Sequence, residues 1–324
     1  MRRRPRHNAR RGGALLGAWL ALPLLMTGCG KPQPEGAPLF SFGRTGIGAC
    51  EFNYPRAGVL GPDKLLYIID KGGRLQVLTQ AGEFVRAWYM PEYLAGKPCG
   101  IAVTPDGRIY AADTHYARVL VFSPDGQELA RFGSYGDGPG QFRLPTDVAI
   151  DPRGFVYVAE YGGNDRISKY DMNWRFLASF GGQDAGEARL ERPQSLIIDM
   201  DGSLWVADSC NHRIVHYSAE GELLGHFGSL GPGVGALRFP YSIDRLSDGT
   251  LVVAEYGNNR VQRFDTAGKS LGTWGSAGRA LGQLAYPWAA VVGDRDRVFV
   301  VDSGNNRIQV IDGTADETWE RTTR

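Results

Sequence analysis

The amino-acid sequence predicts an all-β chain of six repeated units, each with four antiparallel strands, because three residue types recur at fixed offsets. A proline opens each unit, an acidic residue ends its second apolar segment, and an arginine follows the acid. Successive acids are 43 to 48 residues apart. The prolines, here called marker prolines, are Pro55, Pro98, Pro145, Pro193, Pro240 and Pro287. The acid–arginine pairs are Asp70 and Arg74, Asp113 and Arg118, Glu160 and Arg166, Asp208 and Arg213, Glu255 and Arg260, Asp302 and Arg307.

Each unit reads as four strands in order. A short apolar inner strand such as 147–150 follows the marker proline, and a Gly-containing turn leads to the second strand, which ends at the acid. The third strand opens at the arginine, and the fourth ends in Phe-Gly or Trp-Gly. Second strands are apolar on both faces, which indicates sheets covered on both sides. Blades packed around an axis provide that cover, so the pattern predicts a six-bladed β-propeller.

The two ends of the repeat region indicate how the ring closes. The sixth unit stops after its third strand, 307–312, whereas residues 38–43 resemble the fourth strands 128–133 and 176–181. We therefore expect the N-terminal strand to complete blade six, which gives a propeller over residues 38–312. Residues 313–324 are expected to form a polar, disordered tail.

Residues 1–28 have the pattern of an export signal, with six arginines and then an apolar run of thirteen residues. That run is shorter than the ~20 residues that span a bilayer. Residues 25–29 resemble the lipobox of bacterial lipoproteins, so we expect Cys29 to be lipidated and 29–37 to be a flexible tether. An ordinary cleaved signal with an incidental Cys29 is the alternative, since Met26 stands where leucine is usual.

The predicted location is the periplasmic side of a bacterial cell envelope, with the outer membrane as the expected site because Gly30 follows the cysteine. The Arg10-Arg11 pair leaves Sec and Tat export both open. Removal of residues 1–28 changes the formal net charge from +1 to −5. Nucleic-acid binding needs clustered basic residues, so the sequence predicts no nucleic-acid partner. We also expect a membrane link through the lipid anchor only, and a monomer.

The chain resembles the NHL-repeat family over about residues 38–312. The segments that carry the resemblance are 208–214, 302–310 and the approach to a marker proline at 138–145. The resemblance implies a six-bladed propeller but little about activity. Members include RNA-binding domains, a peptide-amidating lyase and sensor ectodomains.

Features present in all six units are interpreted as architecture. The acid–arginine pairs are expected to pin the hairpin between strands two and three in each blade. Function is then expected where the units differ. The residues that follow the marker prolines should form a ring at the mouth of the central channel: Arg56, Cys99, Thr146, Gln194, Tyr241 and Trp288.

Two further pairs, Glu160-Tyr161 and Glu255-Tyr256, extend this candidate face. The longer glutamate side chain is expected to reach past the ion pair to the surface. The resulting face would be Arg56, Thr146, Asp147, Glu160, Tyr161, Gln194, Tyr241, Glu255, Tyr256 and Trp288, with a solvated rim of ordinary surface aromatics as the alternative.

No cofactor is expected, although calcium or zinc in the channel stays open. The amidating lyase places zinc-binding histidines near the ring positions, and this sequence has none there. Asp147 lies near the channel without a complete lactonase-type ligand set. Cys50 and Cys99 are expected in adjacent blades, where an oxidising periplasm could join them in a disulfide.

The sequence therefore favours a non-enzymatic exported propeller that binds a protein partner, an envelope polymer or a small ligand through one face. A metal-dependent hydrolase or lyase with its site at the channel, similar to lactonases or the amidating lyase, is the alternative.

Overall fold

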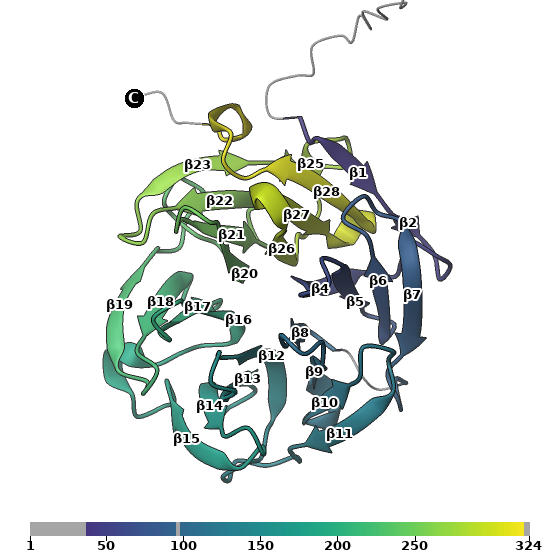
Figure 1. Cartoon of the computed structure of the whole chain (residues 1–324). Helices are drawn as coiled ribbons and strands as arrows, with labels where there is room; N and C mark the ends of the chain where they lie inside the picture. Colours follow the sequence, from purple (N-terminus) through teal and green to yellow (C-terminus); the bar gives the residue numbers. More distant parts are fainter. Residues whose placement is uncertain (1–36, 95–97, 321–324) are drawn as a thin grey trace, which may run out of the picture. The chain divides into compact units, whose positions relative to one another are not determined.

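A computed structural model describes residues 37–94 and 98–320. Six four-stranded antiparallel sheets are arranged around one axis (Figure 1). The predicted six-bladed β-propeller is confirmed. The chain divides into two units, Met1–Gln33 and Pro34–Arg324, and the described residues all belong to the second. Residues 1–36, which include Cys29 and most of the expected tether, lie outside the described part.

The blades follow one another along the chain, and each begins with its inner strand. Blade one holds β4 (Pro55–Leu60), β5 (Leu66–Asp70), β6 (Arg74–Leu78) and β7 (Phe84–Tyr89); blade two holds β8 (Gly100–Val103), β9 (Ile109–Asp113), β10 (Arg118–Phe122) and β11 (Glu128–Phe132); blade three holds β12 (Leu144–Ile150), β13 (Val156–Tyr161), β14 (Arg166–Tyr170) and β15 (Phe176–Phe180). Blade four holds β16 (Pro193–Ile198), β17 (Leu204–Asp208), β18 (Arg213–Tyr217) and β19 (Leu223–Phe227); blade five holds β20 (Pro240–Arg245), β21 (Leu251–Glu255), β22 (Arg260–Phe264) and β23 (Ser270–Trp274); blade six holds β26 (Ala289–Val292), β27 (Arg297–Asp302), β28 (Arg307–Asp312) and β1 (Phe40–Phe42).

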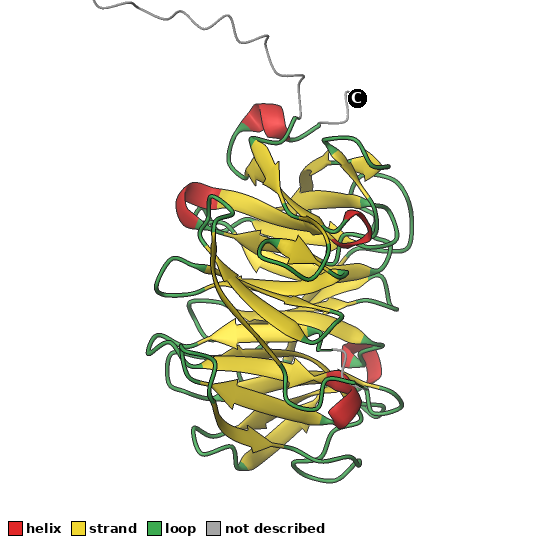
Figure 2. Ribbon diagram, turned by 90° about the vertical axis from the view of Figure 1, so that its right-hand side faces the viewer, coloured by secondary structure: helices red, strands yellow, loops and turns green. Residues whose placement is uncertain are grey.

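Short elements connect the blades. Two small parallel pairs lie in the loops that enter blades one and six: β2 (Arg44–Thr45) with β3 (Glu51–Phe52), and β24 (Ser276–Ala277) with β25 (Gln283–Leu284). The helical content of the described residues is five single 3-10 turns: η1 (Thr114–Tyr116), η2 (Gly186–Ala188), η3 (Asp294–Asp296), η4 (Ser303–Asn305) and η5 (Asp316–Thr318). In the side view of Figure 2, strands fill the body and these turns lie at its edges. Within residues 37–94 and 98–320, no helix is long and apolar enough to cross a membrane.

The ring closes as the sequence predicts. Strand β1 pairs antiparallel with β28, with Phe40 opposite Val310 and Phe42 opposite Ile308. The first and last strands of the propeller therefore share one sheet. Closure therefore joins two segments that lie far apart in the chain.

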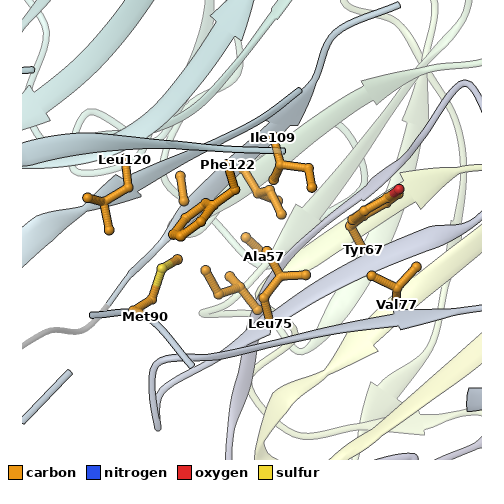
Figure 3. Packing of buried hydrophobic residues seen from close by; sticks show 11 residues of the cluster. Ala57, Tyr67, Leu75, Val77, Met90, Ile109, Leu120 and Phe122 are labelled. Atoms are coloured by element: carbon orange, nitrogen blue, oxygen red, sulfur yellow. The ribbon is translucent and has the colours of Figure 1, made fainter. Parts of the chain in front are cut away.

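Six hydrophobic clusters form the core, one at each junction between neighbouring blades. Strand β5 shows why its pattern is apolar throughout. Tyr67 and Ile69 pack toward blade two, whereas Leu66 and Ile68 pack toward blade six. Figure 3 shows the first junction, where Phe122 and Ile109 of blade two lie beside Leu75 and Ala57 of blade one. Both faces of each sheet are therefore buried, as expected for face-to-face blades.

The Phe-Gly step at the end of the fourth strand has a packing reason. Gly133 has a φ of +91°, and a Cβ there would lie 2.4 Å from the Phe142 ring. Gly228 repeats the arrangement with a φ of +96° and the Leu237 side chain. Only glycine combines this backbone conformation with such close contact.

The expectation of a disordered tail is wrong for residues 313–320. Trp319 is buried in the cluster between blades five and six, and its Nε1 donates a hydrogen bond to the Gly313 carbonyl at 2.9 Å. The composition of this segment is polar, but it buries the large Trp319 side chain and pairs with the backbone of Thr273, so it packs against the ring.

Candidate functional site at the channel mouth

All six acid–arginine pairs form in the hairpins between the second and third strands. Five have Nε–carboxylate distances of 2.5 to 2.8 Å, and the Arg74–Asp70 pair is longer at 3.9 Å. The arginines also bond to loop carbonyls; Arg166, for example, donates to the Gln141 carbonyl at 3.1 Å. Each pair therefore ties its hairpin to the loop that enters the same blade, which is a structural role.

Glu160 and Glu255 are not on the candidate face, contrary to the sequence prediction. Both side chains are fully buried. The Glu160 carboxylate binds Arg166 and the Arg143 amide, and that of Glu255 binds Arg260 and several further donors. Burial raises the pKa of each carboxyl, and these hydrogen bonds partly offset the rise. The extra methylene of glutamate is taken up inside the hairpin and does not reach the surface.

The ring that follows the marker prolines lies at one end of a cavity of about 320 Å³, which all six inner strands line. Five of its six members contribute to this lining: Arg56, Cys99, Gln194, Tyr241 and Trp288. Thr146 differs, because it is fully buried and its hydroxyl donates to the Pro193 carbonyl at 2.7 Å. We call this end of the axis the channel mouth.

Asp147 lines the cavity, but both of its carboxylate oxygens accept backbone hydrogen bonds. The donors are the amides of Val148 at 2.9 Å and of Leu196, on the inner strand of blade four, at 3.0 Å. Burial raises the pKa of Asp147 to about 7. Blade three also approaches blade two closely here, since a Cβ on Gly100 would lie 2.4 Å from the Asp147 Cα.

A second inner-strand carboxylate, Asp244, was missed by the sequence reasoning. It accepts hydrogen bonds from the amides of Arg245 at 2.8 Å and of Val292, in blade six, at 2.7 Å. Burial raises its pKa to about 6. The sequence feature that could have predicted it is an acidic residue in an inner strand that is otherwise mostly apolar. Each aspartate thus accepts a hydrogen bond from a backbone amide on the inner strand of the next blade.

An aromatic cluster covers one side of the mouth, over blades one, five and six. Its members are Tyr54, Tyr241, Tyr256, Tyr286 and Trp288. Tyr241 stacks on Tyr256 with ring centroids 4.5 Å apart, and Trp288 meets Tyr241 edge-on at 4.9 Å. Tyr286 is half exposed at 51%. The predicted members Tyr241, Tyr256 and Trp288 therefore come together on one surface.

Tyr54 and Tyr286, the two members missed from the sequence, immediately precede marker prolines. Both have left-handed backbones, with φ values of 56° and 52°. Their amides donate to asparagine side chains of the preceding blade, at 2.6 Å to Asn306 and 2.7 Å to Asn259. This turn places the side chain that precedes the marker proline at the mouth. The position directly before a marker proline could therefore have predicted both tyrosines from the sequence.

Two arginines lie over aromatic rings from opposite sides of the axis. The Arg56 guanidinium of blade one is 4.7 Å from the Trp288 ring centroid. The Arg192 guanidinium of blade four is 4.8 Å from that of Tyr161. Both line a second cavity of about 160 Å³, together with Cys99, Thr114, His115, Tyr161, Gln194 and Trp288. Arg192 and Thr114 were also missed by the sequence reasoning.

Three of the histidines have structural contacts within the blades. His212 accepts a hydrogen bond from the Phe239 amide through Nδ1 at 3.1 Å, in the place that asparagine takes in blades five and six. His216 stacks on Trp205 at 3.8 Å, and His226 lies 3.1 Å from a Glu187 carboxylate oxygen. Among the described residues, no three His, Cys, Asp or Glu side chains are grouped so that they could hold a metal ion.

The possible Cys50–Cys99 disulfide is absent, because both cysteines are free. Cys50 packs with the cluster between blades six and one, while the Cys99 sulfur lies at the mouth, 3.3 Å from Arg56 Nη1. The two residues precede neighbouring inner strands, but their side chains point into different surroundings. Neighbouring positions in the repeat are therefore not sufficient to bring these two sulfurs together.

Sequence comparison agrees with this repeat geometry. The NHL repeat profile matches residues 190–217 and 284–311, which cover most of blade four and of blade six. The chain is a six-bladed β-propeller that contains NHL repeats. The NHL-repeat propeller is 27% identical over 174 residues to NHL repeat-containing protein 3 of Homo sapiens, and the match covers 46% of this chain and 47% of that protein. The chain therefore spans about half of that relative.

Further relatives and solved structures include enzymes. The NHL-repeat propeller is 33% identical over 176 residues to the peptidyl-glycine alpha-amidating monooxygenase of Mus musculus, which covers half of this chain but 17% of that protein. A streptogramin B lyase structure superposes with a TM-score of 0.61 at 16% identity, over 84% of this chain and 96% of that one. A protein of unknown function from Bacteroides thetaiotaomicron superposes with a TM-score of 0.62 at 15% identity, over 82% of this chain and 71% of that one. At these identities the structures show the shared fold alone.

Proposed function

We propose that this NHL-repeat propeller is a non-enzymatic binding protein whose ligand site is the channel mouth. The observation that supports this is the position of five aromatic side chains and two ring-stacked arginines around two cavities that share lining residues, at positions where the six repeats differ. Aromatic and arginine side chains dominate binding energetics in protein recognition sites. The ligand classes that fit are a partner protein, an envelope polymer or a small molecule.

The polar groups near the axis support binding over catalysis. The carboxylates of Asp147 and Asp244 are occupied by backbone amides, and the hairpin acids are paired with arginines. The two ring-stacked arginines, Arg56 and Arg192, line the smaller cavity.

Binding and turnover can be measured together on the full-length chain. A panel of aromatic and aliphatic carboxylates, amides, lactones and short peptides is tested by calorimetry for binding and by mass spectrometry for conversion. We expect a bound compound to be recovered unchanged. Binding should fall at least tenfold in Trp288→Ala and Tyr256→Ala. Tyr89→Ala, on outer strand β7, is the matched control and should bind as the unaltered chain does. Conversion of a panel member would contradict a binding-only role.

A second candidate, a hydrolase or lyase at the channel, is favoured by one observation. The pKa of Asp147 is raised to about 7 by burial, which is the range expected of a general acid or base, and this residue lines the axial cavity. Metal analysis of the purified chain before and after chelation tests it. A retained equivalent of zinc or calcium, with activity lost in Asp147→Asn, would establish this alternative.

We also propose that the protein is an exported lipoprotein of a bacterial envelope, with Cys29 acylated. The support is the pattern of residues 1–29. Labelling with an alkyne fatty acid should mark the unaltered chain and not Cys29→Ser, and fractionation should place the label in the outer membrane. Label that persists in Cys29→Ser would exclude acylation at this residue.

A further inference from the structure

The smaller cavity at the mouth contains polar groups whose hydrogen-bonding capacity is not used. Residues of blades two, three and four line it together with Arg56 of blade one and Trp288 of blade six, and it is about 160 Å³ in volume. A ligand held there would occupy the site of the proposed function, so the assignment of its chemistry rests on that function.

Arg192 differs from the hairpin arginines. Across the described residues, no carboxylate lies within 4.0 Å of its guanidinium, whereas each hairpin arginine has a buried acid within that distance. Its Nε is buried without a hydrogen-bond partner. A left-handed backbone with φ of 54° and the Tyr161 ring fix its position. A fixed guanidinium with unused donors binds planar oxyanions well, because its fork matches their geometry.

Thr114 supplies the second unused group. Its side chain is 1% exposed and lines the same cavity, and its Oγ1 is buried without a partner. A buried hydroxyl without a hydrogen-bond partner is costly, so a ligand oxygen that accepts from the Thr114 hydroxyl gains affinity. Gln194, which is 4% exposed in the same lining, adds amide donors near Arg192.

The remaining lining restricts the size and shape of the ligand. The aromatic contacts in the cavity are Tyr161 and Trp288. A cavity of roughly 150 Å³ accommodates one benzene ring. We propose that this cavity binds a single-ring aromatic carboxylate, with the carboxylate at Arg192 and Thr114 and the ring between Tyr161 and Trp288.

Calorimetry of the full-length chain with benzoate tests the assignment, with benzamide and acetate as matched probes. We expect benzoate to bind with one-to-one stoichiometry and at least tenfold more tightly than either probe. Benzamide lacks the charge, and acetate lacks the ring. Benzoate affinity should fall at least tenfold in Arg192→Gln and several-fold in Thr114→Val.

Conservative variants separate recognition from folding. Arg192→Lys keeps the charge and should bind more tightly than Arg192→Gln, and Thr114→Ser keeps the hydroxyl and should bind almost as the unaltered chain does. Arg108→Gln, in the turn between β8 and β9, is the arginine control and should have no effect. Equal benzoate affinity in Arg192→Gln and the unaltered chain would overturn the inference.

Failure of the inference and failure of the proposed function give different results. If benzoate does not bind but another panel compound binds in a Trp288-dependent manner, the carboxylate assignment is wrong and the binding function stands. If no panel compound binds at the mouth, the carboxylate assignment and the binding of a small ligand at the mouth are both contradicted.

Discussion

Trp319 lies directly against Gly272, on the outer strand of blade five. A Cβ on Gly272 would be 2.6 Å from the Trp319 Cβ. The next residues, Thr273 and Glu320, exchange two backbone hydrogen bonds at 2.9 and 3.2 Å. The segment that leaves blade six therefore adds a short paired edge to blade five, and the two neighbouring blades are linked beyond their shared core.

Removal of this contact should destabilise the ring. We expect Trp319→Ala to lower the free energy of unfolding by about 3 kcal/mol, because a large buried aromatic side chain and its hydrogen bond are lost. Denaturant unfolding followed by circular dichroism measures the change. Leu94→Ala, at a 92% exposed position, is the control and should change stability little. An equal loss in both variants would contradict the structural role of the tail.

Gly100 should not tolerate a side chain. The nearest atoms to an added Cβ are the backbone and carboxylate of Asp147, which cannot easily move, so Gly100→Ala should cost about 2 kcal/mol or more. Gly225, in outer strand β19, has no atom within 4 Å of such a Cβ. Gly225→Ala should therefore be neutral or slightly stabilising. Thermal unfolding of both variants checks this; similar melting temperatures would show that the inner strands pack less tightly than this geometry implies.

The hairpin ion pair of blade five should act as a unit. Arg260→Met leaves the Glu255 carboxylate buried without its cation and should cost about 3–5 kcal/mol. Adding Glu255→Gln removes the uncompensated charge, so the double variant should be more stable than Arg260→Met alone. A double-mutant cycle by denaturant unfolding measures the coupling. Additive losses would indicate that the two side chains act independently.

His212 should make stability depend on pH. Burial lowers the pKa of His212 below its ordinary value, with the Arg238 charge acting in the same direction, and its Nδ1 accepts a hydrogen bond only when unprotonated. As pH falls below about 6.5, the histidine of the unfolded chain takes up a proton before that of the folded chain, so the free energy of unfolding declines. At higher pH both histidines are neutral and the stabilising contribution of His212 is fully present. His216, whose pKa burial also lowers, contributes with the same sign.

The variant His212→Asn isolates this contribution. Asparagine fills the same position in blades five and six, so stability near pH 7.5 should be retained and the decline between pH 7 and 5 should be shallower. Unfolding curves at several pH values measure both quantities. His226→Asn, at a partly exposed site on β19, is the control. An unchanged pH profile in His212→Asn would assign the decline to other groups.

Much of the fold was predictable because it is repeated. Six copies of the proline, acid and arginine pattern predicted the blades and their hairpin pairs, and the missing fourth strand predicted that β1 would complete blade six. Trp319 was not predicted to be buried because it occurs once, outside the repeat, in a polar segment. The sequence left a Cys50–Cys99 bond open, and the structure has both cysteines free, because neighbouring positions along adjacent blades do not fix where side chains point.

The sequence by itself determined the number of blades, the order of strands, the closure of the ring and the ring positions at the mouth, since local periodicity and repeat offsets control all of these. Only the tertiary structure decided which side chains converge. Arg56 and Arg192 come from opposite blades, and Tyr54 and Tyr286 reach the mouth through left-handed turns before proline. The structure also showed that Glu160 and Glu255 turn inward. The physical reason is that distances across the axis depend on the packing of six blades together, which no single repeat encodes.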